Sequence, residues 1–178
     1  MDCKNEIPRH SSCVGEAWMH GMFKIKYCHK IFDDEQVRNC CEQLFKDACK
    51  KYEIKISELG FDNNHVHMLV DMGLRTRPQI AKLLKGYVAK KLFLNFPWMK
   101  KPKQEGGLFW KSGLWNPSYY LESPKDMKRI INYIRNQKYG KKIIDKNQTT
   151  LIGYASWPSP KGLQATGVAP VVSASIWQ

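Results

Sequence analysis

The sequence lacks any long hydrophobic run, and this absence bears on where the protein acts. No stretch approaches the ~18 consecutive apolar residues that a membrane-spanning helix needs. Residues 1–6 have no apolar core of the kind found in a secretory signal, and no lipidation motif is present. We therefore expect a cytoplasmic protein with no membrane partner.

Acidic side chains are scarce, and the imbalance of charge indicates a class of partner. The chain has 29 Lys plus Arg against 16 Asp plus Glu, a formal net charge of +13. Such an excess implies a large anionic partner, and nucleic acid is favoured over an acidic membrane surface. Between Met72 and Gln104 there are nine Lys or Arg and no acid. A charge run is commonly a solvated helix face, but this one-signed block favours phosphate binding.

The cysteines form no C-x-x-C pair. The six of them stand at positions 3, 13, 28, 40, 41 and 49. Without an export signal they are expected to be free thiols. Cys3, His10, Cys13 and His20 are zinc-ligand types, but their spacings match no common zinc finger. A structural zinc site is therefore the less favoured interpretation.

The chain shows no internal repeat, and its length suits one domain with a core of its own. Residues 1–157 are expected to form that domain. Residues 158–178 are rich in Pro, Gly, Ser, Ala and Val and are expected to be a flexible tail.

Hydrophobic periodicity and capping residues predict the elements of the domain. Strands are expected over residues 18–27, 53–60 and 64–70, and helices over residues 35–52, 77–96 and 124–139. Asp33 or Asp34 would cap the first helix, Pro78 suits the first turn of the second, and Ser123 would cap the third in a near capping box. The aromatic-rich segment 108–121 suggests a strand or hairpin, whose rings either pack in the core or stack on unpaired bases.

Two histidines stand one residue apart in the strand-like run 64–70. Side chains alternate along a strand, so His65 and His67 must emerge on the same face, about 7 Å apart at the backbone. Two imidazoles on a rigid strand can hold one metal ion, although a sheet can also carry two histidines without a function. A third ligand and a reactive group must come from elsewhere in the chain.

The third helix carries Tyr133 and Gln137, which are four residues apart and therefore expected to lie one turn above each other. Both fall on the flank of its isoleucine stripe, at the border between core and solvent. A tyrosine in such a place can be a packing residue with its hydroxyl in water.

Together with the basic segment, these motifs resemble the single-tyrosine HUH transposases, small enzymes of insertion sequences that move as single-stranded DNA. The stretches that carry the resemblance are, in chain order, Arg9-His10, His20, Lys26-Tyr27, Asn64-His65-Val66-His67-Met68-Leu69-Val70, Leu83-Leu84-Lys85-Gly86-Tyr87, Phe96-Pro97, Leu108-Phe109-Trp110 and Tyr133-Ile134-Arg135-Asn136-Gln137. They cover most of the chain in the order and with the gaps of that family.

The resemblance implies a role for each site residue. His65, His67 and Gln137 would hold a divalent cation, Mg²⁺ or Mn²⁺, that polarises a scissile phosphate. Tyr133 would be the nucleophile that forms a 5′-phosphotyrosine link and frees a 3′-hydroxyl. The cation and nearby lysines would favour the phenolate of a group whose unperturbed pKa is about 10.

The family also implies the fold and the partners. It is an α+β arrangement, an antiparallel sheet flanked by helices and related to the ferredoxin-like or RNA-recognition fold. The protein would act as a homodimer on single-stranded DNA with hairpin ends, and the tyrosine helix of one subunit can serve the histidines of the other. Basic surfaces bind the hairpins, and the residues that carry over are Arg75, Arg77, Lys82, Lys85, Lys90 and Lys91.

Two departures from the family pattern remove no catalytic residue. Asn64 stands where many relatives have an acid, which weakens the expected orientation of His65 by a neighbouring carboxylate. Cys28-His29 replaces a more basic pair, which alters the expected DNA contacts. A non-catalytic nucleic-acid binder of the same fold and a relaxase-like nickase remain alternatives, whereas a two-histidine phosphoesterase would need a second histidine motif.

Overall fold

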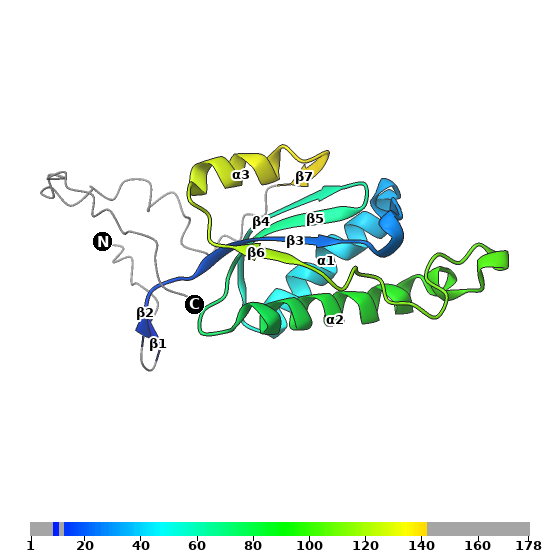
Figure 1. Cartoon of the computed structure of the whole chain (residues 1–178), viewed down its shortest axis with the longest axis horizontal. Helices are drawn as coiled ribbons and strands as arrows, with labels where there is room; N and C mark the ends of the chain where they lie inside the picture. Colours follow the sequence, from blue (N-terminus) through cyan, green and yellow to red (C-terminus); the bar gives the residue numbers. More distant parts are fainter. Residues whose placement is uncertain (1–8, 11–12, 142–178) are drawn as a thin grey trace, which may run out of the picture.

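A five-stranded antiparallel sheet lies at the centre of the computed structural model, which describes residues 9–10 and 13–141 (Figure 1). Its strands are β3 (Trp18–Lys24), β4 (Lys55–Asp62), β5 (His65–Asp71), β6 (Tyr120–Glu122) and β7 (Tyr139–Lys141). Their order in the sheet is β6-β3-β5-β4-β7. A separate short pair, β1 (Arg9–His10) and β2 (Cys13–Val14), precedes the sheet.

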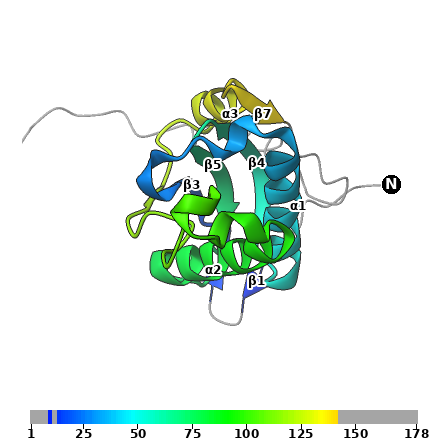
Figure 2. The same cartoon turned by 90° about the vertical axis from the view of Figure 1, so that its right-hand side faces the viewer.

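The helices divide between the two faces of this sheet (Figures 1 and 2). They are α1 (Glu35–Lys51), α2 (Arg77–Asn95) and α3 (Met127–Arg135), with 3₁₀ turns at Lys26–Cys28, Ile31–Asp33, Pro97–Lys100 and Lys103–Glu105. The helices α1 and α2 pack together on one face, and α3 lies on the other against β4 and β5. The sequence β3-α1-β4-β5-α2-β6 with this strand order is the ferredoxin-like arrangement, which confirms the expected α+β fold.

Alternation along β5 separates the core from the site. Val66, Met68 and Val70 are fully buried among the side chains of α1 and α2, so His65 and His67 point to the face that α3 covers. Phe45 of α1 and Leu84 of α2 are fully buried in the same core. The hydrophobic core thus lies on one side of the sheet and the histidines on the other.

Local capping explains where the two core helices begin. The Asp34 carboxylate accepts hydrogen bonds from the backbone N–H groups of Gln36 (2.8 Å) and Val37 (3.2 Å), which confirms one of the two expected caps. Thr76 and Gln79 form a reciprocal capping box in front of α2, with Pro78 in the first turn.

Three expected boundaries are wrong. The first strand ends at Lys24, because the chain turns into a 3₁₀ segment in which Tyr27 has a positive φ of 59°. Only Tyr120–Glu122 of the expected aromatic hairpin is a strand. The third helix is capped by the Asp126 side chain, which accepts from the Arg129 N–H, and not by Ser123.

The aromatic segment before β6 divides between the core and the surface. Phe109 and Trp115 are buried, as expected for packing residues, whereas Trp110 and Tyr120 are exposed. In the described ranges no helix is long and apolar enough to cross a membrane. The expected domain boundary after residue 157 lies outside those ranges.

Candidate metal and nucleophile site

The centre of the site is a pair of buried histidines on neighbouring strands. β3 and β5 run antiparallel. Their register pairs His20 with Leu69 and His67 with Met22, so the two histidines share a face with one residue pair between them. The His20 Nε2 and His67 Nδ1 atoms are 3.1 Å apart, and the rings stack with centroids 5.2 Å apart. His20 is 8% exposed and His67 is 6% exposed.

His65 lies beside this pair and is oriented by its neighbour in sequence. Its ring meets that of His67 edge-on, with centroids 4.9 Å apart. The Asn64 side-chain oxygen lies 2.9 Å from His65 Nδ1 and accepts its proton. Asn64 therefore supplies an acceptor at the position where the resemblance implied weaker orientation of His65, and His65 Nε2 keeps its lone pair.

Burial makes these imidazoles neutral. Burial, and after it the neighbouring His65 and His20, lower the pKa of His67 to about 3. Burial also lowers the pKa values of His65 and His20 below their ordinary value. A neutral imidazole is the form that binds a metal ion, so the site is prepared for one at neutral pH.

The helix α3 brings a tyrosine to the histidines. The Tyr133 hydroxyl oxygen lies 3.4 Å from His67 Nε2, and the two rings meet edge-on with centroids 5.1 Å apart. The Tyr133 side chain is 47% exposed. Its hydroxyl is therefore placed beside the candidate metal ligands and is still open to a substrate.

A glycine in β4 allows α3 to lie directly on the sheet. A Cβ atom on Gly60 would stand 2.3 Å from the Ile134 carbonyl oxygen and 3.2 Å from Gln137 Cγ. Ile134 is fully buried, and the Arg135 guanidinium donates to the buried Glu58 carboxylate at 2.5 Å. The position of Tyr133 therefore follows from close backbone packing and a partly buried ion pair at the two residues that come directly after it.

Gln137 does not lie on the helix as expected. The helix ends at Arg135 with Asn136 as its C-cap, so Gln137 belongs to the turn before β7. Its carboxamide nitrogen donates to the Tyr133 carbonyl oxygen at 3.2 Å. Tyr133 and Gln137 are therefore in contact, as expected from their spacing, although a turn and not a continuing helix brings them together.

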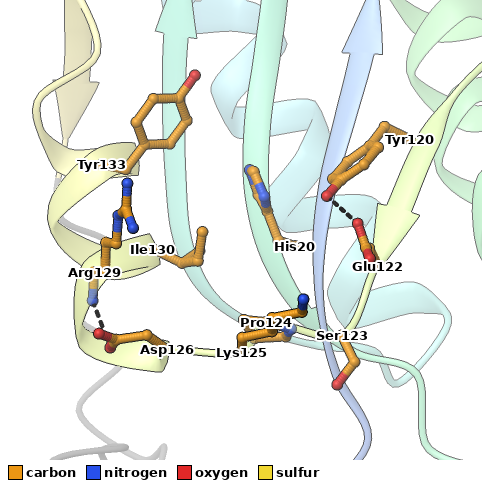
Figure 3. A pocket seen from close by; sticks show the side chains of 10 residues that line it. All are labelled: His20, Tyr120, Glu122, Ser123, Pro124, Lys125, Asp126, Arg129, Ile130 and Tyr133. Atoms are coloured by element: carbon orange, nitrogen blue, oxygen red, sulfur yellow. Dashed lines mark hydrogen bonds between the residues drawn. The ribbon is translucent and has the colours of Figure 1, made fainter.

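A pocket of about 500 Å³ opens between α3 and the β3–β6 edge of the sheet (Figure 3). Its lining comprises His20, Tyr120, Glu122, Ser123, Pro124, Lys125, Asp126, Arg129, Ile130 and Tyr133. Figure 3 shows Tyr133 and His20 on two sides of the pocket, and the Tyr120 hydroxyl donates to the Glu122 carboxylate. The pocket therefore joins the tyrosine to a space with both cationic and aromatic walls.

The six expected DNA-binding residues lie away from the histidines. Arg77, Lys82, Lys90 and Lys91 are exposed on α2, which covers the face of the sheet opposite to α3. Arg75 and Lys85 are instead engaged by backbone carbonyls: Arg75 donates to Tyr52 (2.5 Å), and Lys85 donates to Asn116 (2.6 Å), Pro117 and Ser118. Burial also lowers the pKa of Lys85.

The donors at His65 and His67 suit a divalent ion when an oxygen ligand completes the set. Within residues 9–10 and 13–141, no cluster of three or more His, Cys, Asp and Glu side chains is arranged for a metal. An amide such as that of Gln137, or a phosphate oxygen, would have to supply the remaining ligand. Of the alternative zinc ligands, His20 contacts His67, and Cys3 lies outside the described residues, so that site is not tested.

Sequence reasoning assigned no role in the site to His20 or Gly60. His20 is 47 residues from His67 in the chain, and only strand pairing brings them together. A lone histidine in a strand gives no signal of such a contact. Gly60 at the end of a predicted strand gives a weak one, since a glycine inside a strand often marks a close backbone approach.

Comparisons with known proteins agree on one family. Residues 13–137 match the family model described as "Transposase IS200 like". The ISDra2 transposase TnpA of Deinococcus radiodurans is 26% identical over 135 residues, which are 74% of this chain and 91% of that protein.

One solved structure gives the same result for the fold. A crystal structure of a transposase from Deinococcus radiodurans R1 superposes with a TM-score of 0.59 and 28% identity, over 74% of this chain and 98% of that one. A REP-associated tyrosine transposase bound to a REP hairpin has a TM-score of 0.49 and 8% identity, over 93% of this chain and 100% of that one, and is too distant to bear on function.

Proposed function

The chain belongs to the IS200-like transposase family, and from this premise we propose that it cleaves and rejoins single-stranded DNA with Tyr133 as the nucleophile. The observation that supports this role is the 3.4 Å approach of the Tyr133 hydroxyl to Nε2 of the buried, neutral His67. A tyrosine beside two candidate metal ligands and open to a pocket combines the parts that phosphodiester cleavage needs.

The metal site of this proposal consists of His65, His67 and Gln137. The two imidazoles can present Nε2, and the Gln137 side chain is close to the backbone of Tyr133. A bound Mg²⁺ or Mn²⁺ would supply a Lewis acid for the scissile phosphate. The protein residues orient the nucleophile, exclude water from His67 and supply neutral ligands.

The proposed reaction balances without ATP. The Tyr133 oxygen attacks phosphorus, a bond to the tyrosine oxygen forms, and the bond from phosphorus to the 3′ oxygen breaks. The phenol loses its proton to solvent, and the leaving 3′ oxygen takes one up. A second 3′-hydroxyl then attacks the 5′-phosphotyrosine, restores the tyrosine and joins two strands.

The proposal extends to the DNA partner and the assembly. The wall of the pocket beside Tyr133 contains Arg129 and Lys125 together with Glu122 and Asp126, and its two cations can contact the backbone of a single strand. We propose that exposed basic side chains on α2 hold a DNA hairpin and that the enzyme is a homodimer, as its resemblance to single-tyrosine transposases implies. Within one chain, Tyr133 already faces His67.

The test is a covalent-adduct assay with the full chain. The protein is incubated with Mn²⁺ and labelled single-stranded oligonucleotides copied from the DNA that flanks its gene, and adducts are resolved on a denaturing gel. Wild type is expected to form an adduct and a rejoined product, whereas Tyr133→Phe loses both and still binds the DNA. Tyr27→Phe is the matched control, since Tyr27 is also exposed and lies on another segment.

Each other outcome favours a different function. An adduct formed by Tyr133→Phe would show that another residue is the nucleophile. DNA binding by wild type without an adduct would favour a non-catalytic binder. Cleavage without a rejoined product would favour a relaxase-like nickase.

A further inference from the structure

His20 occupies a place that the proposed chemistry leaves without a role. It lies on β3 outside the H-x-H motif, is nearly buried, and contacts His67 through a pair of ring nitrogens 3.1 Å apart. Its ring also meets those of Tyr120 (5.5 Å) and Tyr133 (5.9 Å) edge-on. His20 is thus packed between the candidate nucleophile and a candidate metal ligand.

The contact between two neutral imidazoles allows only two arrangements of protons. Either His67 Nδ1–H donates to His20 Nε2, or His20 Nε2–H donates to His67 Nδ1. The first leaves a lone pair on His67 Nε2, and the second places a proton there. Only the first tautomer of His67 can accept a hydrogen bond from the Tyr133 hydroxyl, or bind a metal ion, at Nε2.

Two further contacts favour the first arrangement. The Tyr133 hydroxyl is a natural donor and lies 3.4 Å from His67 Nε2. The neighbouring His65 is held in the corresponding tautomer, because the Asn64 oxygen accepts from its Nδ1. With His20 as the acceptor, both histidines of the motif present the same atom, Nε2, to the site.

We propose that His20 is a positioning residue that accepts the Nδ1 proton of His67 and so holds the Nε2 lone pair toward the metal site and Tyr133. Partners of this kind orient metal-binding histidines, and their loss commonly lowers metal affinity by about 10- to 100-fold. The metal part of this inference rests on the proposed function, whereas the tautomer of His67 does not depend on it.

The experiment measures the tautomer and the affinity separately on the full chain. Long-range ¹H–¹⁵N spectra of the histidine rings in metal-free protein report which nitrogen carries the proton. Titration calorimetry with Mn²⁺ alone reports the affinity. The variants are His20→Phe, which keeps a ring without nitrogens, and His20→Gln, whose amide oxygen can accept. His29→Phe is the control, since His29 packs on Phe109 away from the site.

We expect wild type and His29→Phe to show the Nδ1–H tautomer of His67. His20→Phe should lose the fixed tautomer and bind Mn²⁺ about 10- to 100-fold more weakly, and His20→Gln should recover most of the affinity. An Nε2–H tautomer in wild type, or unchanged affinity in His20→Phe, would overturn the role of His20. Absence of Mn²⁺ binding by wild type would instead contradict the metal site of the proposed function.

Discussion

His67 connects the other histidines of the site to the candidate nucleophile. Its ring contacts those of His20, His65 and Tyr133. It is nearly buried, so its proton affinity in the folded chain differs strongly from that in the unfolded chain. Protonation of this one group is therefore coupled to folding.

We expect acid to destabilise the protein through His67. The folded-state pKa is about 3 against an ordinary value of 6.5, so between these values the unfolded chain holds a proton that the folded chain does not. The stabilisation is complete above pH 6.5 and falls as pH is lowered, by about 2 kcal/mol between pH 7 and pH 5. Urea unfolding of wild type and His67→Phe at both pH values measures it. An equal loss of stability in His67→Phe would exclude this cause.

The histidine pair could be predicted from the sequence, but its surroundings could not. Strand alternation alone places His65 and His67 on one face. The partner of His67 is set by the pairing of β3 with β5, which is a long-range property of the fold. A contact between neighbours in sequence can be predicted more easily, and the Asn64 side chain does contact the His65 ring.

The helix α3 is held to the sheet by a few specific contacts. Gly60 touches the Ile134 carbonyl, and Arg135 pairs with the buried Glu58. At its far end, the Tyr139 hydroxyl and Lys138 contact Asp33. The distance between α3 and β4 therefore decides whether Tyr133 reaches His67.

We expect Gly60→Ala to displace α3. Its added methyl would overlap the Ile134 carbonyl oxygen, which belongs to the backbone and cannot rotate away. The strain should lower stability by about 1–3 kcal/mol and reduce adduct formation at least about tenfold, since a small misplacement of a reacting group has a large effect. Amide hydrogen exchange within α3 and the adduct assay measure the two effects.

Gly86→Ala is the matched control for this substitution. A Cβ at Gly86 in α2 has nothing within 4 Å, so alanine should be neutral or stabilise the helix by up to about 1 kcal/mol. If the amides of α3 exchange hydrogen at the wild-type rate in Gly60→Ala, the close packing of α3 on Gly60 is contradicted.

Local signals predicted the core helices better than α3. For α1, Asp34 stands next to the first helical residue and matches a strong cap pattern. For α3, both Ser123 and Asp126 are suitable cap residues, and they are three residues apart. The tertiary structure determines which of them caps the helix. The residues between β6 and α3 must carry the chain from the edge of the sheet to its face, so the helix begins at the later cap.

The molecule as a whole separates its basic helix from its histidines. The helices α2 and α3 lie on opposite faces of the sheet (Figure 2), and His67 contacts Tyr133 on the face of α3. DNA that reaches both regions must pass around the edge of the sheet. Substitutions that weaken DNA binding should therefore differ from those that weaken metal binding.

We expect Lys90→Gln combined with Lys91→Gln to weaken DNA binding without changing Mn²⁺ affinity. The slope of log K against log salt for a DNA hairpin should become shallower by up to about 1.8, since each neutralised phosphate of a duplex contributes about 0.9. Fluorescence anisotropy at several salt concentrations and Mn²⁺ calorimetry measure the two properties. The charge-matched control is Lys30→Gln with Lys50→Gln, two exposed lysines outside α2. An equal effect in both double variants would contradict a binding surface on α2.

The contact between Gly60 and Ile134 also has a genetic consequence. Every missense change of a single base in a glycine codon encodes a residue that has a Cβ atom. The backbone of α3 leaves no room for that atom, whatever side chain follows it. Any missense change at codon 60 should therefore impair function, whatever the chemistry of the encoded residue. At the codons for His65, His67 or Tyr133, the effect should depend on that chemistry.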